Sequence, residues 1–189
     1  APRPTVTTQV EVLVVGGGPA GAAAATTLAR AGLEVLVVDR ATFPRDKACG
    51  DGVGPDGVDV LRRLDVLNVL DGYPAVGDVT VVSPAGRVAS GRAPRAGHVV
   101  PREVLDARLH AAAVARGAIP VHRRVRSLTV VDDGVVLDDR LRARWVVGAD
   151  GANSTVRRLV GAGAQPRSRT GLAMRGYGHA PRVQSLTIH

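Results

Sequence analysis

The segment from Val10 to Asp39 constrains the fold of this chain more than any other part of its sequence. It begins with a short apolar run rich in β-branched residues, which is typical of a parallel strand buried on both faces. Gly16, Gly18 and Gly21 follow with the spacing G-x-G-x-x-G. An alanine-rich helical stretch and a second apolar run complete the segment. This order predicts a strand, a glycine turn, a helix and a parallel strand.

Each glycine of the turn has its own physical reason. Gly16 permits the tight turn out of the strand, Gly18 lets the backbone approach a pyrophosphate, and Gly21 lets the helix lie close to the sheet. The first amides of a helix have no partner within it, and they favour a phosphate anion. The segment therefore predicts a site for the ADP half of a dinucleotide.

Four more residues belong to this predicted site. Pro19 begins the helix at a position where no hydrogen bond is lost, and Ala20 follows it. Asp39 ends the second strand, where a carboxylate accepts hydrogen bonds from ribose hydroxyls, and Arg40 comes next.

The composition limits the partners of the chain. Its 189 residues suffice for one substantial domain, or for one domain and part of another. The formal charge of +8 is carried almost wholly by arginines, and aromatic residues make up only 2% of the chain. Without a stacking platform for bases we expect no nucleic-acid binding. The arginines indicate a solvated surface, or contacts with phosphates of a nicotinamide cofactor or an anionic substrate.

Other chemistry has little support in the sequence. Cys49 is the one cysteine, so no disulfide forms within the chain. This fits a reducing compartment, and we expect a cytoplasmic protein. The first ten residues lack the apolar stretch of a secretory signal. The histidines do not have the spacing of metal ligands, so we expect no metal site, and no catalytic residue can be named.

Two further segments identify the class of dinucleotide protein. The segment from Pro44 to Gly52 reads PRDKACGDG, and the segment from Gly148 to Arg158 reads GADGANSTVRR. The first is similar to the P-x-x-K-x-C-G-x-G signature of geranylgeranyl reductases. The second resembles the Asp-Gly motif of the flavoprotein superfamily that also contains aromatic hydroxylases and squalene epoxidases. Residues 173–177, AMRGY, resemble the A-x-R-x-Y stretch of those reductases.

This resemblance implies an α/β fold, with a Rossmann-like FAD-binding domain and the beginning of a mixed-sheet substrate domain. We expect the FAD-binding domain over residues 1–165, with strands around 76–100 that join the substrate sheet. Residues 166–189 would start a truncated substrate domain. Because family members carry a later Gly-Asp motif, we expect an N-terminal part of a larger enzyme. The isolated chain would then bind FAD weakly or not at all, and it would be inactive.

The resemblance also implies contacts between the Cys49 segment and the flavin. Gly50 and Gly52 permit positive φ and a close approach of the backbone to the isoalloxazine ring. Cys49 is small and soft, and we place it against the flavin. An inert thiol in the core and a catalytic nucleophile are the second and third interpretations.

Four contacts are implied elsewhere in the chain. Arg102 would reach the flavin pyrophosphate or ribityl chain, unless it is an ordinary arginine at a helix start that pairs with Asp106. Val125 would contact the adenine through its backbone. Asp150 and Gly151 would lie near a phosphate. Asn153 or Ser154 could instead simply cap the helix that follows, and both interpretations can hold together.

The implied activity is that of an FAD-dependent oxidoreductase, in which NAD(P)H reduces FAD and the reduced flavin gives hydride to an isoprenoid double bond. The partner would be an isoprenoid or another small-molecule substrate, and a lipid substrate would bring the protein to a membrane surface. One alternative is an FAD-dependent monooxygenase or halogenase of the same superfamily. Another is a dinucleotide-binding module without catalytic activity.

Residue patterns also predict the elements between these motifs. We expect a helix over residues 58–70 and a helix over 102–116. Two strands, 76–83 and 87–90, should form a hairpin around a Pro-Ala-Gly turn, and residues 98–100 should form another short strand.

Overall fold

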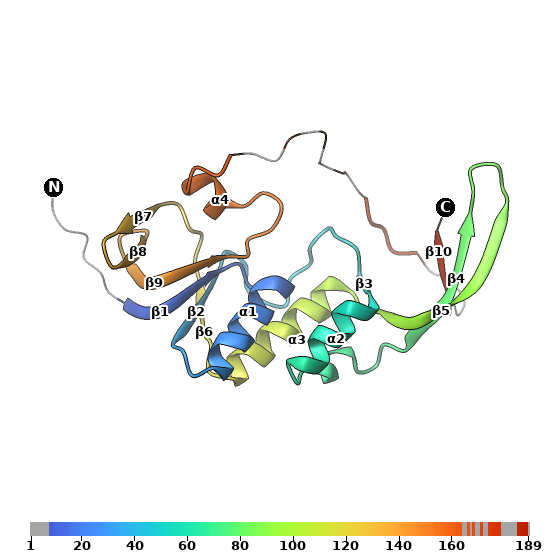
Figure 1. Ribbon diagram of the computed structural model, residues 1–189, viewed down its shortest axis with the longest axis horizontal. Helices are drawn as coiled ribbons and strands as arrows, with labels where there is room; N and C mark the ends of the chain where they lie inside the picture. The colour runs from blue at the N-terminus through green and yellow to red at the C-terminus, as the bar shows by residue number, and fades with distance from the viewer. Residues whose placement is uncertain are drawn as a thin grey trace. The chain divides into compact units, whose positions relative to one another are not determined.

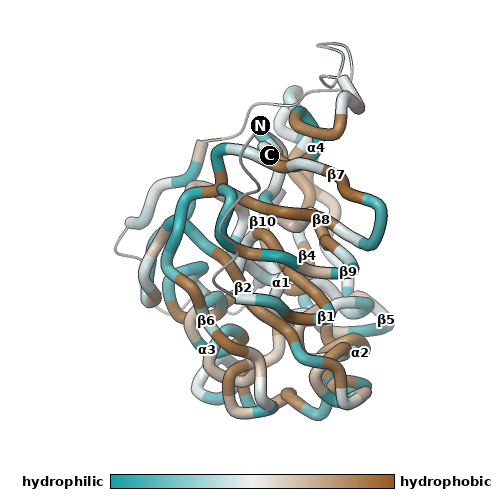
Figure 2. Tube along the Cα trace, turned by 90° about the vertical axis from the view of Figure 1, so that its left-hand side faces the viewer, coloured by the Kyte–Doolittle hydropathy of each residue, from teal (hydrophilic) through white to brown (hydrophobic). Residues whose placement is uncertain are grey.

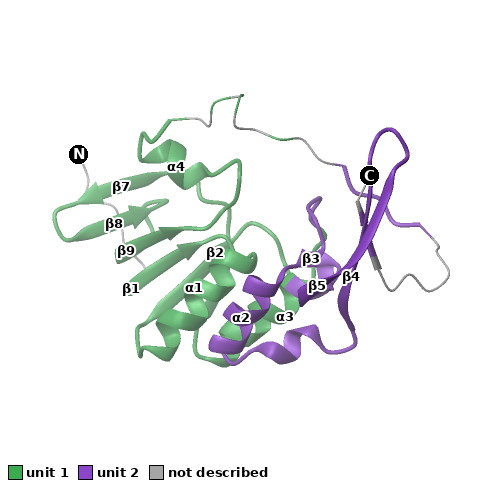
Figure 3. Cartoon of the chain, turned by 45° about the vertical axis from the view of Figure 1, so that its right-hand side comes forward, with its two compact units in different colours: residues 1–46, 106–172 green, residues 47–105, 173–189 purple. Residues whose placement is uncertain are grey.

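The computed structural model describes residues 8–163, 166, 168, 171, 174–178 and 185–188. The chain divides into two compact units. Unit 1 contains residues 1–46 and 106–172, and unit 2 contains residues 47–105 and 173–189 (Figure 3, green and purple). The predicted α/β class is confirmed. The predicted domain boundary at residue 165 came from the family resemblance, and it stays a prediction.

A six-stranded sheet with the order β6-β2-β1-β9-β8-β7 forms the centre of unit 1 (Figure 1). Four neighbouring strands are parallel, and the remaining two continue the sheet as an antiparallel meander. The parallel strands are β1 (Thr8–Val15), β2 (Val35–Asp39), β6 (Ile119–His122) and β9 (Leu141–Gly148), and the antiparallel ones are β7 (Leu128–Val131) and β8 (Gly134–Leu137).

Both faces of this sheet are covered, which explains the nearly continuous apolar runs of β1 and β2. On one face Val12 and Val14 pack in a cluster with Ala25 of helix α1 and Ala113 of helix α3. On the other face Leu13 packs in a cluster with residues of the meander and of helix α4. Figure 2 shows the hydrophobic residues along the central strands. The helices are α1 (Pro19–Arg30), α3 (Arg102–Ala115) and α4 (Thr155–Leu159).

Unit 2 contains a four-stranded sheet with the order β10-β4-β5-β3. Strands β4 and β5 form the predicted hairpin, closed by hydrogen bonds between Ser83 and Arg87 and between Gly86 and Ser83. The elements are β3 (Gly52–Val53), helix α2 (Pro55–Arg63), the 3₁₀ helix η1 (Leu67–Leu70), β4 (Ala75–Val82), β5 (Val88–Val99) and β10 (Ser185–Ile188).

The predicted helix over residues 58–70 is wrong at both ends. Helix α2 begins three residues earlier, because Pro55 at its first turn fixes a helical φ. It ends at Arg63, since Asp65 takes a left-handed φ of 57°. The amide of Val66 bonds back to Leu61 and that of Asp65 to Arg62, the pattern of a helix-ending Schellman turn. Such turns usually contain glycine, so no residue of this segment indicates the end of the helix.

The two strands predicted over residues 87–90 and 98–100 are one strand, β5. Its pairing with β4 is interrupted: Arg92 pairs with Asp78 and Gly97 with Val76. Pro94 lies in the interruption, where its missing amide costs no ladder hydrogen bond. The predicted strand ended before Gly91 and Pro94, because such residues break regular strands. The irregular strand β5 accommodates both of them.

Among the described residues, no helix has the length and apolar character that crossing a bilayer requires.

Candidate functional site

The glycine turn between β1 and α1 has no room for side chains at two positions. Gly16 has a φ of 103°, and a β-carbon there would lie 2.4 Å from the carbonyl oxygen of Ala149. A β-carbon at Gly21 would lie 1.7 Å from the carbonyl oxygen of Gly16. The helix therefore starts directly against the turn, as the spacing of the glycines predicted.

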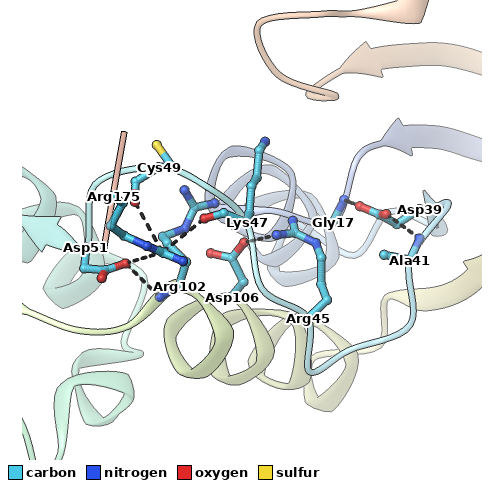
Figure 4. A network of polar contacts seen from close by, with 10 residues as sticks. All are labelled: Gly17, Asp39, Ala41, Arg45, Lys47, Cys49, Asp51, Arg102, Asp106 and Arg175. Carbon is cyan, nitrogen blue, oxygen red and sulfur yellow. Dashed lines mark hydrogen bonds and ion pairs between the residues drawn. The ribbon is translucent and has the colours of Figure 1, made fainter. Parts of the chain in front are cut away.

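The carboxylate of Asp39 supports this turn from the end of β2. Its Oδ2 accepts a hydrogen bond of 2.6 Å from the amide of Gly17, and its Oδ1 accepts one of 2.8 Å from the amide of Ala41 (Figure 4). The structure thus brings the predicted ribose ligand to the glycine turn. Its contact with a ribose stays a prediction, as do the contacts assigned to Gly18, Pro19 and Ala20.

An aromatic pair that the sequence did not indicate packs on the same turn. The rings of Phe43 and His110 stack with centroids 4.4 Å apart. A β-carbon at Gly17 would lie 3.0 Å from Cε2 of Phe43 and 3.1 Å from Cδ2 of His110. Burial lowers the pKa of His110 below 6.5, and the negative charge of Asp39 opposes this shift. The burial therefore favours the neutral imidazole beside the turn.

A second pair fixes the segment that follows β2. Nη1 of Arg45 lies 2.9 Å from Oδ2 of Asp106, whose side chain is fully buried in helix α3 (Figure 4). The same guanidinium lies over the ring of Phe43, with Cζ 5.1 Å from its centroid. A buried carboxylate requires such a partner. The ion pair of Asp106 with Arg45 was not predicted, because the sequence indicates only Arg102 as a partner of Asp106.

Asp150 is engaged in capping helix α4. Its Oδ2 accepts hydrogen bonds from the amides of Thr155 and Val156, and its Oδ1 accepts one from the hydroxyl of Ser154. Ser154 in turn accepts from the amide of Arg157 and is the N-cap residue. The capping interpretation is therefore confirmed for Ser154.

The remaining predicted residues of unit 1 have these positions. Gly151 has a φ of 85°, which favours glycine. The side chain of Arg40 is exposed, and its carbonyl oxygen lies 2.9 Å from Nε2 of His122. Val125 is buried in the core cluster on the meander side of the sheet. The cofactor contacts of Asp150, Gly151, Arg40 and Val125 stay predictions.

In unit 2 the residues 47–52 form a segment that we call the Cys49 loop. Cys49 is exposed, so an inert thiol in the core does not fit the structure. Neither Gly50 nor Gly52 has a positive φ, and both have open space where a β-carbon would lie. The two glycines therefore do not use the positive φ that they permit. The open space leaves the backbone of the loop accessible, and the flavin contacts stay predictions.

Asp51 connects the Cys49 loop to two distant segments. Its Oδ1 accepts hydrogen bonds from Nη1 of Arg175, at 2.9 Å, and from the amide of Arg102, at 3.1 Å (Figure 4). Its Oδ2 accepts one of 2.8 Å from the hydroxyl of Tyr177. Arg102 is itself buried, 7% exposed, at the start of helix α3. The two motifs noted at residues 44–52 and 173–177 thus meet at a side chain to which the sequence analysis assigned no role.

A parallel sheet with a glycine turn at its first strand and an acid at the end of its second defines a dinucleotide-binding protein. Residues 9–177 match the model of the FAD binding domain family. The chain therefore belongs to the family of FAD binding domains, and the suspected resemblance is confirmed at this level.

Two relatives and one solved structure show where the similarity lies. The menaquinone reductase of Mycolicibacterium smegmatis is 39% identical over 96% of this chain and 48% of its own length. The geranylgeranyl diphosphate reductase of Rhodobacter capsulatus is 36% identical over 79% of this chain and 39% of its own length. The chain thus spans about half the length, or less, of these curated relatives.

The similarity to a solved structure concerns the fold. The flavin-dependent monooxygenase PieE, solved with FAD and substrate, superposes with a TM-score of 0.69 at 24% identity. The match covers 83% of this chain and 33% of that protein.

Proposed function

We propose that this chain is the FAD-binding part of a reductase that saturates an isoprenoid double bond of a lipid. Membership of the FAD binding domain family gives the cofactor class. The choice of reaction and substrate rests on the Cys49 loop, whose sequence has the signature of geranylgeranyl reductases, and on the named relatives.

The observation that supports FAD most directly is the start of helix α1, directly after the glycine turn. No side chain caps this helix at Gly18, and its first turn contains no acidic residue. Its first amides are therefore left for a pyrophosphate, and the helix dipole favours that anion. Asp39 lies at the neighbouring strand end, within hydrogen-bond distance of Gly17. These residues fit the ADP half of FAD.

FAD, once reduced by a nicotinamide cofactor, supplies a hydride for one alkene carbon, while the other carbon takes a proton from a donor. The residues of this chain bind the cofactor and orient it. The turn holds the pyrophosphate, and Asp39 orients the ribose while it braces the turn. In unit 2 the Cys49 loop presents an exposed, glycine-containing backbone, which we assign to the flavin ring.

The substrate class is argued from what the two named reductases have in common. Menaquinone and geranylgeranyl diphosphate share neither a quinone nor a diphosphate, but both carry a polyprenyl chain. Since both relatives are named as reductases, a reaction on the group that their substrates share is the simplest common activity. We therefore propose a polyprenyl chain as the substrate, with NADH or NADPH as the electron donor. A substrate of this kind lies in a bilayer, so we also propose that the protein works at a membrane surface.

Because we expect the isolated chain to be inactive, the proposal is tested on the complete enzyme of which it would be the FAD-binding part, with excess FAD and NADH or NADPH in the absence of oxygen. Menaquinone and geranylgeranyl diphosphate serve as substrates, and mass spectrometry reads the products. We expect a gain of hydrogen atoms in pairs, located on the prenyl chain. Oxygen uptake in air with an oxygenated product would overturn the proposal in favour of a monooxygenase. FAD binding with neither reduction of a substrate nor uptake of oxygen would overturn it in favour of a dinucleotide-binding module without catalytic activity.

A further inference from the structure

We propose that Asp51, Arg175 and Tyr177 form a clamp that positions the Cys49 loop, with Asp51 as its central positioning residue. The clamp joins two segments that lie 124 residues apart in the sequence. The inference goes beyond the proposed function, and its test requires no cofactor.

Three oxygens of the Cys49 loop converge on one nitrogen of Arg175. Nη1 of Arg175 lies 3.1 Å from the carbonyl oxygen of Lys47, 3.3 Å from that of Cys49 and 2.9 Å from Oδ1 of Asp51. Three oxygens with negative charge or partial charge repel one another when they point at the same place. The positive guanidinium at their centre offsets this repulsion. The loop therefore adopts its shape around Arg175.

Hydrogen bonds to both of its oxygens orient the carboxylate of Asp51. Tyr177 donates its hydroxyl to Oδ2 of Asp51, while Arg175 binds Oδ1. The Cζ of Arg175 also lies 4.7 Å from the centroid of the Tyr177 ring, which adds a cation–π contact. Each of the three side chains thus contacts the other two, so the carboxylate and the guanidinium have fixed orientations.

The ion pair between Arg175 and Asp51 is largely buried. The side chains of Arg175 and Asp51 are 15% and 9% exposed, so water screens their attraction only weakly. When one partner of such a pair is removed, the other is left with an uncompensated charge. Loss of Arg175 would therefore release the loop rather than leave it in place. Because the amide of Arg102 also donates to Asp51, the carboxylate connects the loop to the start of helix α3 as well.

The sequence supplies a direct probe of loop motion. Cys49 is the single cysteine of the chain and it is exposed, so a nitroxide label can be attached there alone. Its carbonyl oxygen accepts the hydrogen bond from Arg175, so the label sits on the clamped residue itself. The paramagnetic resonance line shape reports motion on the nanosecond scale, on which loops move.

The experiment compares labelled wild-type chain with the variants Arg175→Met and Asp51→Asn. We expect the rotational correlation time of the label to fall about twofold or more in both, because a released loop moves on this timescale. In the variant that carries both substitutions, the correlation time should fall no further than in the single variant with the larger effect. Arg175→Lys keeps the charge but loses the planar fork, so its correlation time should lie between those of wild type and Arg175→Met.

The matched control is Arg95→Met. Arg95 is also an arginine of unit 2 that binds carboxylates, those of Asp56 and Asp59, but these lie on helix α2. Its label mobility should equal that of the wild type. Circular dichroism of every variant verifies that the secondary structure is retained. Unchanged label mobility in Arg175→Met would overturn the clamp. An increase in label mobility in Arg95→Met equal to that in Arg175→Met would also overturn it, since it would indicate general loosening of unit 2.

Discussion

At Gly21, the backbone oxygen of Gly16 lies only 1.7 Å from the place of a β-carbon. An alanine there must push the helix away from the strand, because backbone atoms cannot rotate aside as a side chain does. We expect Gly21→Ala to lower the free energy of unfolding by about 3 kcal/mol. Urea denaturation measures the change. Gly91→Ala is the control, since nothing lies within 4 Å of a β-carbon at that position. An equal loss in both variants would contradict the steric explanation.

Asp39 has a structural role that can be measured without any cofactor. Its carboxylate accepts hydrogen bonds from the amides of Gly17 and Ala41, and Gly17 is buried. Asp39→Ala leaves that buried amide without its acceptor, so we expect a loss of about 1–3 kcal/mol in the free energy of unfolding. Asp132→Ala, at an exposed turn, should change it by less than about 0.5 kcal/mol. A stable Asp39→Ala variant would show that the turn holds its shape unaided.

His110 makes the stability of unit 1 depend on pH. Burial holds its pKa below 6.5 in the folded protein, while Asp39 acts in the opposite direction. The unfolded chain therefore binds more protons just below pH 6.5. The contribution of neutral His110 is complete above that pH, and it is lost as the pH falls through the folded pKa.

This contribution should disappear in His110→Phe, which keeps an aromatic ring against Phe43. Urea denaturation between pH 5 and pH 8 checks the prediction, with stability compared at each pH. Thr129→Ala, at an exposed residue without a titratable group, serves as the reference and should keep the wild-type slope. If His110→Phe shows the same slope as the wild type, another group is responsible.

Among the α-helices that the structure describes, α4 is the shortest, so its capping hydrogen bonds weigh heavily in its stability. Asp150 and Ser154 together bind three of its first amides. We expect Ser154→Ala to cost about 1 kcal/mol and Asp150→Ala somewhat more, since Asp150 accepts more hydrogen bonds. Thermal unfolding measures both. FAD affinity is then compared under conditions in which both variants are fully folded. If it falls far more in Asp150→Ala than in Ser154→Ala, Asp150 also binds the cofactor. Equal losses of FAD affinity would leave Asp150 a capping residue.

The elements differ in how well their sequences reveal them. The unit of β1, α1 and β2 is predictable because its apolar runs, its glycines and its Pro19 all indicate the same structure. The end of α2 is not, because Asp65 takes the left-handed conformation in place of the usual glycine. The length of β5 is not predictable either, because Pro94 breaks a regular strand but fits an irregular one. Local rules fail where a neighbouring strand or turn accommodates the exception.

At the scale of the whole molecule, the site also has a part that the sequence predicts and a part that it does not. The glycines of the turn and Asp39 can be predicted, because their spacing within one segment is characteristic. Phe43 with His110, and Asp51 with Arg175, bring together residues far apart in the chain. A single sequence contains no signal for such pairs, since each member alone has an ordinary explanation. The Cys49 loop illustrates this: its signature suggests a cofactor contact, but not the arginine around which it folds.

The order of the strands also affects how the chain must fold as the ribosome makes it. Strand β1 lies between β2 and β9, so one of its edges has no partner until about residue 148 has been synthesised. Unit 2 is completed still later, because β4 pairs with β10. The unpaired edge of β1 is thus exposed until then, and nascent chains with such edges are prone to aggregate. We therefore expect added chaperones that bind nascent chains on the ribosome to raise the yield of soluble protein.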